Sequence, residues 1–157
     1  MVLLCCTMPY SNRSFAMAAM DARMENLFHC LSRCMDYFGK APVIAKSDNM
    51  SQWVKRCSRY EPSFTDSTDE WALYYDVIPD VTRVKKPRDK GPVEGFVSKL
   101  YNYVYARLRD EIIFTLEELN ARIFQLMDEF NNRPIQKKGV SRNQVFYEKE
   151  YPVMKDL

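Results

Sequence analysis

The sequence predicts a mixed α/β domain with one central sheet, and two observations support this fold class. The chain has 157 residues, of which 46% are apolar, so it can form a single domain with a real hydrophobic core. Short apolar or alternating runs typical of strands are interspersed with segments that have the three-to-four-residue repeat of helices. The predicted order is β-β-α-β-α-β-α-α-α, which is typical of a sheet covered by helices.

The N-terminal part contains a predicted β-hairpin followed by an amphipathic helix. Apolar runs at residues 2–7 and 14–18 have the composition of strands, and the turn-forming sequence PYSN lies between them. Asp21 is the expected N-cap of the helix, because apolar residues recur at helical spacing from there as far as Gly39.

A third strand is predicted at residues 42–46, and its end is of functional interest. Asp48 follows this strand in the sequence SDN, and sheet proteins usually place their sites at the carboxyl ends of strands. Residues 50–62 are mixed and polar, and we expect a short helix and a loop there. The remaining expected elements are a helix at 67–75 capped by Ser67, a strand at 77–81, helices at 93–108 and 115–130, and a short helix at 141–150.

Charge is informative only where it clusters. The chain has 23 basic and 21 acidic residues and a formal net charge of +2, so no global field is expected. One cluster stands out, because five of the eight positions from Arg83 to Lys90 are basic. A cationic loop of this kind, placed before a helix, is typical of a phosphate-binding surface.

The cysteines and the apolar N-terminus indicate a reduced, intracellular protein. Five cysteines are an odd number, and they have no framework spacing. The opening MVLLCCTM is only about eight residues long and has neither a basic segment nor a cleavage site, so it is expected to be a buried strand.

Two carboxylates are the candidate site. Asp48 is at a strand end and Glu94 is in the first turn of the helix that follows the basic loop, where the helix dipole keeps a carboxylate ionised. Two acids beside a cationic loop suit metal-dependent phosphoryl transfer, since divalent cations need hard oxygen ligands. The alternatives are structural: an Asx hydrogen bond in a turn for Asp48, and a dipole partner for Glu94.

Other residues have both a functional and a structural interpretation. There are two interpretations of the basic residues Arg133, Lys137 and Lys138. They either extend the phosphate-binding surface of the cationic loop or are solvated. Tyr101, Tyr103 and Tyr105 either stack on bases or, as we favour, are structural. Zinc binding is disfavoured for His29, Cys30 and Cys34, because no second ligand pair has the required spacing. Trp53 and Trp71 are expected in the core or at a subunit contact.

Several segments, in this order, resemble the catalytic core of the IstA-type transposases, within the retroviral-integrase superfamily. They are MPYSNRSFAMA, MENLFHCLSRCMDYFGKAPVIAKSDNM, KRCSRYEPSF, VKKPRDKGPVEGFV, TLEELNARIFQLMDEFNNRPIQ and SRNQVFYEKEYP. The resemblance implies an RNase H-like mixed sheet flanked by helices, a three-acid active site with Mg²⁺ or Mn²⁺, and DNA strand cleavage and transfer.

The resemblance also implies roles and partners. Asp48 resembles the second acid and Glu94 the third. The loop residues Lys85, Lys86, Arg88 and Lys90 would contact phosphates of the transposon end or target, and the alternative for them is a solvated charged loop. The implied partners are the DNA of transposon ends and target, an ATPase helper of the IstB type, and further copies of the parent transposase. The implied location is the nucleoid in the bacterial cytoplasm, with no role for a membrane.

The first acid of that family lies on a strand upstream of the segment that resembles residues 2–11. We therefore expect an N-terminally truncated chain without the first strand and without its aspartate, inactive alone. Residues 1–110 would be a partial catalytic core and residues 111–157 a helical C-terminal extension of it. The alternative function is a non-catalytic remnant that binds DNA or pairs with a transposase and inhibits it; an unrelated α/β interaction domain is disfavoured.

Overall fold

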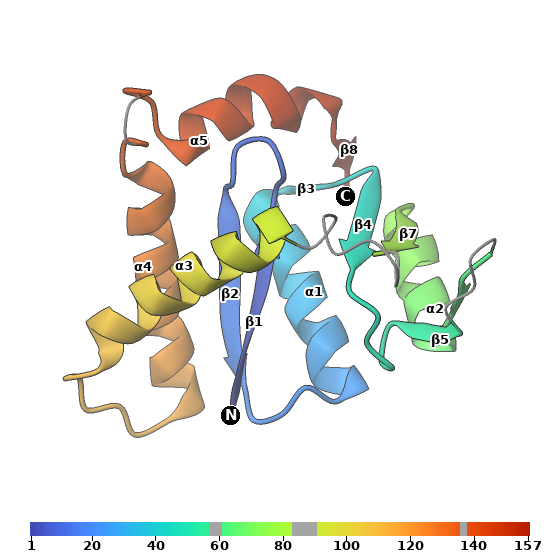
Figure 1. The fold of residues 1–157 in the computed structure, drawn as a ribbon, viewed down its shortest axis with the longest axis horizontal. Coiled ribbons are helices and arrows are strands. Elements are labelled where there is room, and N and C mark those ends of the chain that lie inside the picture. The colour runs from blue at the N-terminus through green and yellow to red at the C-terminus, as the bar shows by residue number, and fades with distance from the viewer. Residues whose placement is uncertain (57–60, 83–90, 136–137) are drawn as a thin grey trace.

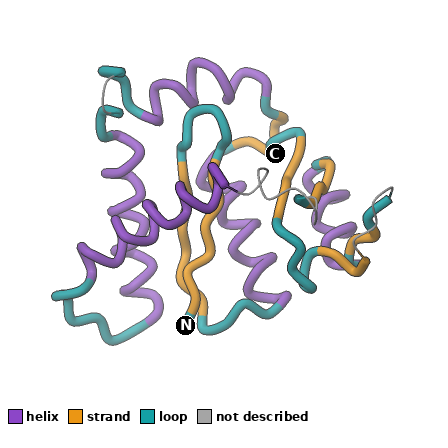
Figure 2. The backbone as a smooth tube through the Cα atoms, in the orientation of Figure 1, coloured by secondary structure: helices purple, strands orange, loops and turns teal. Residues whose placement is uncertain are grey.

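The computed structural model describes residues 1–56, 61–82, 91–135 and 138–157, with only the backbone for residues 91–94. Its strands form separate pairs. Antiparallel β1 (Val2–Thr7) and β2 (Ser14–Ala19) form one pair, and parallel β4 (Ile44–Ser47) and β7 (Ile78–Val81) form another, with α1 between the two pairs in Figures 1 and 2. The chain is mixed α/β as predicted, but the prediction of one continuous sheet is wrong for the described residues.

The helices and the minor strands complete the fold. None of the helices in the described part of the chain combines the length and hydropathy that a bilayer crossing requires. The helices are α1 (Met24–Phe38), α2 (Asp66–Tyr75), α3 (Gly91–Leu108), α4 (Leu116–Asn132) and α5 (Arg142–Val145), followed by η2 (Phe146–Glu150) and η3 (Tyr151–Val153). The minor strands pair as β3 (Lys40–Ala41) with β8 (Lys155–Asp156) and β5 (Val54–Arg56) with β6 (Ser63–Phe64).

The β1–β2 hairpin lies between two helical layers. Phe15 belongs to a core with the apolar face of α1, whereas its neighbour Ala16 belongs to a second core formed with α3 and α4. This split follows from the two-residue repeat of a strand, which points successive side chains to opposite faces. Figure 1 shows α3 crossing the hairpin on the side opposite α1.

Two asparagines of α4 cover the free edge of β2. Asn131 accepts from the backbone N–H of Ser14 at 2.9 Å and donates to its carbonyl at 2.8 Å, and Asn120 forms the same pair of bonds with Ala18, at 2.8 and 3.1 Å. Each side-chain amide thus satisfies a donor and an acceptor that a neighbouring strand would otherwise satisfy. The outer edge of this pair is therefore closed.

The C-terminal segment holds the turn of the hairpin. Glu150 accepts backbone hydrogen bonds from Ser11 at 3.0 Å and from Tyr10 at 3.2 Å. The buried guanidinium of Arg13 lies over the rings of Tyr37 and Phe146, with centroids 4.5 and 4.6 Å from its Cζ atom. Cation–π contacts in a desolvated setting of this kind attach the hairpin to α1 and to the C-terminal segment.

Three local predictions are corrected by the structure. Helix α1 begins at Met24 rather than at Asp21, because Asp21 accepts from the Arg23 N–H and from Asn26 in a turn ahead of the helix. Thr65, not Ser67, caps α2, since its hydroxyl accepts from the Thr68 N–H. In the region predicted as a short helix and loop, the structure has strand β5 paired with β6.

Unfolding is expected to become easier as the pH rises above about 9, because two half-buried groups, the Cys5 thiol and the Tyr37 hydroxyl, keep their protons. Burial, and then the neighbouring Cys6, raises the pKa of the Cys5 thiol from 9.0 to about 12. Burial likewise raises the pKa of Tyr37 from 10.0 to about 12. In the unfolded chain both groups ionise earlier, so stability is fully present below pH 9 and is lost as the pH rises towards 12.

Urea unfolding at several pH values tests this expectation. Allowing for solvent screening, we expect a loss of roughly 2–4 kcal/mol between about pH 8 and pH 12. The Tyr37→Phe variant should lose less over the same range, whereas a control change of the exposed Tyr74 to Phe should leave the profile unaltered. A flat profile for the natural chain would contradict the assignment.

Candidate functional site

Asp48 lies at the carboxyl end of the parallel pair, as the sequence predicts. Strand β4 ends at Ser47, which is aligned with Val81 at the end of β7. The pairing continues one residue further, because the Thr82 N–H donates to the Ser47 carbonyl at 3.0 Å. The carboxyl ends of both strands therefore lie side by side, which is where sites in parallel sheets usually lie.

The carboxylate of Asp48 is exposed and lightly engaged. Its main-chain carbonyl accepts from the Met50 N–H at 2.8 Å, so the backbone makes the turn. Among the described residues its side chain accepts only from the Ser47 hydroxyl, at 3.4 Å. The structural alternative, a carboxylate held by backbone N–H groups in an Asx turn, is thus not observed, and the hard oxygen atoms that Mg²⁺ prefers remain available.

Glu94 occupies the first turn of α3, as predicted, since the helix begins at Gly91. Its side chain lies outside the described residues, and so does the whole cationic loop with Lys85, Lys86, Arg88 and Lys90. That these groups meet Asp48 therefore stays a prediction. Within the described residues no three possible metal ligands are clustered.

The cysteines of α1 have a packing role, as expected. Cys30 and Cys34 are buried in the core between α1 and the hairpin, whereas His29 of the same helix is exposed. Burial raises the pKa of the Cys34 thiol well above its ordinary range. Trp53 and Trp71 are also core residues, and the Trp53 indole donates to the Asp80 carbonyl at 2.8 Å, which ties β7 to the segment after Asp48.

The fold matches solved integrase cores. The catalytic core domain of BIV integrase superposes with a TM-score of 0.71 and 13% identity, covering 96% of this chain and 88% of that one. The HTLV-2 integrase catalytic core domain, solved in complex with magnesium, gives a TM-score of 0.66 at 14% identity over 91% of this chain and 82% of that one. The chain therefore has the mixed α/β, RNase H-like fold of retroviral integrase catalytic cores.

Sequence similarity points to bacterial transposition. The chain is 34% identical over 147 residues to "Putative transposase y4bL/y4kJ/y4tB" of Sinorhizobium fredii, and 31% identical over 147 residues to "Putative transposase for insertion sequence IS408" of Burkholderia multivorans. The chain is a transposase homologue. The matches cover 94% of this chain but only 28% of each relative, and no protein-family model matches the sequence.

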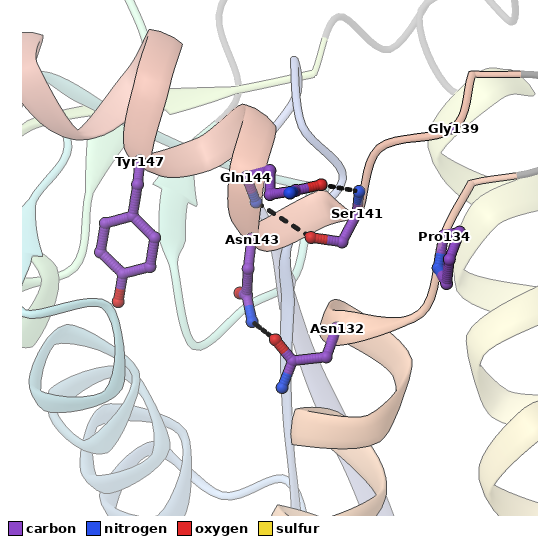
Figure 3. A pocket seen from close by; sticks show the side chains of 7 residues that line it. All are labelled: Asn132, Pro134, Gly139, Ser141, Asn143, Gln144 and Tyr147. Atoms are coloured by element: carbon purple, nitrogen blue, oxygen red, sulfur yellow. Dashed lines mark hydrogen bonds between the residues drawn. The ribbon is translucent and has the colours of Figure 1, made fainter.

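One pocket of this transposase homologue lies away from Asp48. It has a volume of about 600 Å³ and lies between the end of α4 and the start of α5 (Figure 3). Its polar groups are largely engaged with each other: Gln144 and Ser141 form a capping box, and Asn143 donates to Asn132 at 2.6 Å. The pocket is thus a feature of the helix junction and is separate from the strand end that carries the candidate acid.

Proposed function

We propose that the chain supplies two of the three acids of an insertion-sequence transposase of the IstA type. The reaction is metal-dependent DNA cleavage and strand transfer. The observation that carries this proposal is Asp48, an exposed carboxylate at the carboxyl end of β4 to which no backbone N–H of the described residues donates, in a chain with an integrase-core fold. The sequence similarity to a putative transposase supports DNA as the substrate class.

The chemistry is two successive substitutions at phosphorus. In the first, the oxygen of water bonds to a phosphorus atom at the transposon end, and the bond to the 3′-oxygen breaks, leaving a 3′-hydroxyl. In the second, this hydroxyl attacks a target phosphodiester, and the target's own 3′-oxygen leaves. Bound Mg²⁺ or Mn²⁺ would activate the attacking oxygen and stabilise the leaving one. Asp48 and Glu94 would hold the metal, and Lys85, Lys86, Arg88 and Lys90 would contact phosphates.

The first acid, in this proposal, lies on a strand that pairs with β1 and β4. Whereas α4 covers the β2 edge, the described backbone of β1 pairs only with β2 and that of β4 only with β7. Unpaired edges are templates for a further strand. Without the first acid, the 157-residue chain is expected to be inactive, because two carboxylates hold two metals poorly.

A chimaera tests this proposal. The segment that precedes the matched region in the Sinorhizobium fredii relative is fused ahead of Met1, and nicking of supercoiled DNA is measured with Mg²⁺ or Mn²⁺. We expect the chimaera to cleave and the chain alone to be inactive. Cleavage by the chain alone, or a well-folded chimaera whose metal-dependent activity does not exceed background, would contradict the proposal.

A second function is favoured by the same unpaired edges. A chain that exposes a strand edge can pair with another copy or with a full-length transposase and act as a non-catalytic inhibitor. This partner differs from those of the catalytic proposal, in which the parent transposase would act as an oligomer with an ATPase helper of the IstB type. If adding the chain suppresses strand transfer by an active transposase, with Asp48→Asn suppressing equally well, the inhibitor function gains support.

A further inference from the structure

The outer face of α3 carries two exposed tyrosines in a parallel arrangement. Tyr101 and Tyr105 are 48% and 60% exposed, and their ring centroids are 5.9 Å apart with planes inclined by only 10°. Their separation of four residues places them on one stripe of the helix. Both rings therefore present apolar surface to solvent from the same side of α3.

Tyr103, two residues from each, has a structural role instead. Its ring packs edge-on against Phe130 at 5.0 Å, and the Arg107 guanidinium lies 3.5 Å from the ring centroid. The buried side of α3 is completed by Leu100 and Val104. The helix thus needs neither Tyr101 nor Tyr105 for its attachment to the core, and the exposed pair has no packing explanation among the described residues.

The charge of this helix suits a polyanion. From Gly95 to Arg109 the sequence contains three basic residues and no acidic one. Lys99 and Arg109 are exposed, and neither pairs with an acidic residue among those described. Arg109 follows Tyr105 by four residues and therefore lies on the side of the tyrosine pair, whereas Lys99 lies on another side of the helix. Proteins bind single-stranded nucleic acid with exposed aromatic rings beside a cation, since bases stack on the rings and phosphates contact the cation.

We propose that Tyr101 and Tyr105 form a stacking platform for unpaired nucleotides of a DNA strand. The inference rests on the proposed function, because it assumes that DNA reaches α3. At 1.5 Å per residue, positions 101 and 105 are about 10 and 16 Å along the helix from position 94. At 3.4 Å per nucleotide step, a strand with its reacting phosphate at Glu94 would reach the platform about three to five nucleotides away.

The platform makes a specific prediction about bases as opposed to phosphates. Fluorescence anisotropy is measured with a single-stranded DNA of about 15 nucleotides, with an abasic strand of the same length, and with the matching duplex. We expect Tyr101→Leu/Tyr105→Leu to weaken binding of the base-containing strand about 10-fold or more and to leave abasic and duplex binding unchanged. The Phe/Phe double variant should retain the affinity, because it keeps the rings.

Two controls distinguish base stacking on Tyr101 and Tyr105 from DNA binding by other parts of the chain. Tyr74→Leu, on the exposed face of α2, should have no effect. Neutralising Lys85, Lys86 and Lys90 should flatten the salt dependence of binding to every DNA, whereas the tyrosine variants should leave that slope unchanged. Circular dichroism and thermal unfolding check that each variant is folded.

Four results would overturn the platform. Equal affinity of the natural chain and the Leu/Leu variant for the base-containing strand would do so, as would an equal loss with the abasic strand. Self-association that the Leu/Leu variant abolishes would assign the tyrosines to a contact between copies of the chain. Binding of no DNA by the natural chain would count against the proposed function as well, whereas intact duplex binding would leave that function standing.

Discussion

Replacing Asn131 by alanine is expected to lower the free energy of unfolding by about 3–5 kcal/mol. Asn131 is fully buried, and its amide bonds the N–H and the carbonyl of Ser14 and donates to the Tyr37 hydroxyl at 2.8 Å. The change strips these buried groups of their partner, and each unsatisfied group costs about 1–3 kcal/mol. A loss of this size is a large part of the stability of an ordinary domain.

The same helix offers matched controls for this prediction. Asn132→Ala removes an exposed asparagine next in sequence and should cost well under about 1 kcal/mol. Asn120→Ala removes the equivalent hydrogen bonds to Ala18 at a half-buried position, so we expect an intermediate loss of unfolding free energy. Chemical denaturation followed by circular dichroism measures all three. Similar losses for the Asn131 and Asn132 variants would show that the hydrogen bonds from Asn131 to β2 contribute little to stability.

Changing Asp48 to asparagine is expected to abolish metal-dependent cleavage by the chimaera. The substitution preserves size and removes the charge that would hold the cation. Metal stabilisation of the transition state is worth several kcal/mol, so the loss should be roughly 10³-fold or more. Glu94→Gln should have a similar effect, and Asp69→Asn, an exposed acid on α2, should have none. A loss of less than about 10-fold at Asp48 would remove it from the metal site.

The elements with regular sequence patterns were predictable. The hairpin, α1 and α4 have clear periodicity. Thr115, where the sequence predicts the start of the helix at 115–130, is the N-cap of α4, because its hydroxyl accepts from the Glu118 N–H at 3.1 Å. The short strand β5 was not predictable, because three residues give too little periodicity to distinguish a strand from a turn. Its position depends on tertiary contacts, such as the burial of Trp53.

The two asparagines of α4 that bond to β2 show a different limit of prediction from the sequence. Asn120 and Asn131 look like ordinary polar positions of an amphipathic helix, and only the approach of β2 gives them partners. The position of Asp48 followed from a local pattern, a short apolar run followed by SDN. Whether its side chain was held by the turn depended on the direction of individual hydrogen bonds, and a sequence does not specify those.

A manganese titration followed by nuclear magnetic resonance tests whether Asp48 and Glu94 share a metal site. Paramagnetic Mn²⁺ broadens the amide signals of residues near it, so residues 47–50 and 91–95 can be followed separately in the 157-residue chain. We expect both segments to broaden together, and we expect Asp48→Asn or Glu94→Gln, but not Asp69→Asn, to remove the effect from both. Broadening of one segment alone, or broadening that survives both substitutions, would contradict a shared metal site.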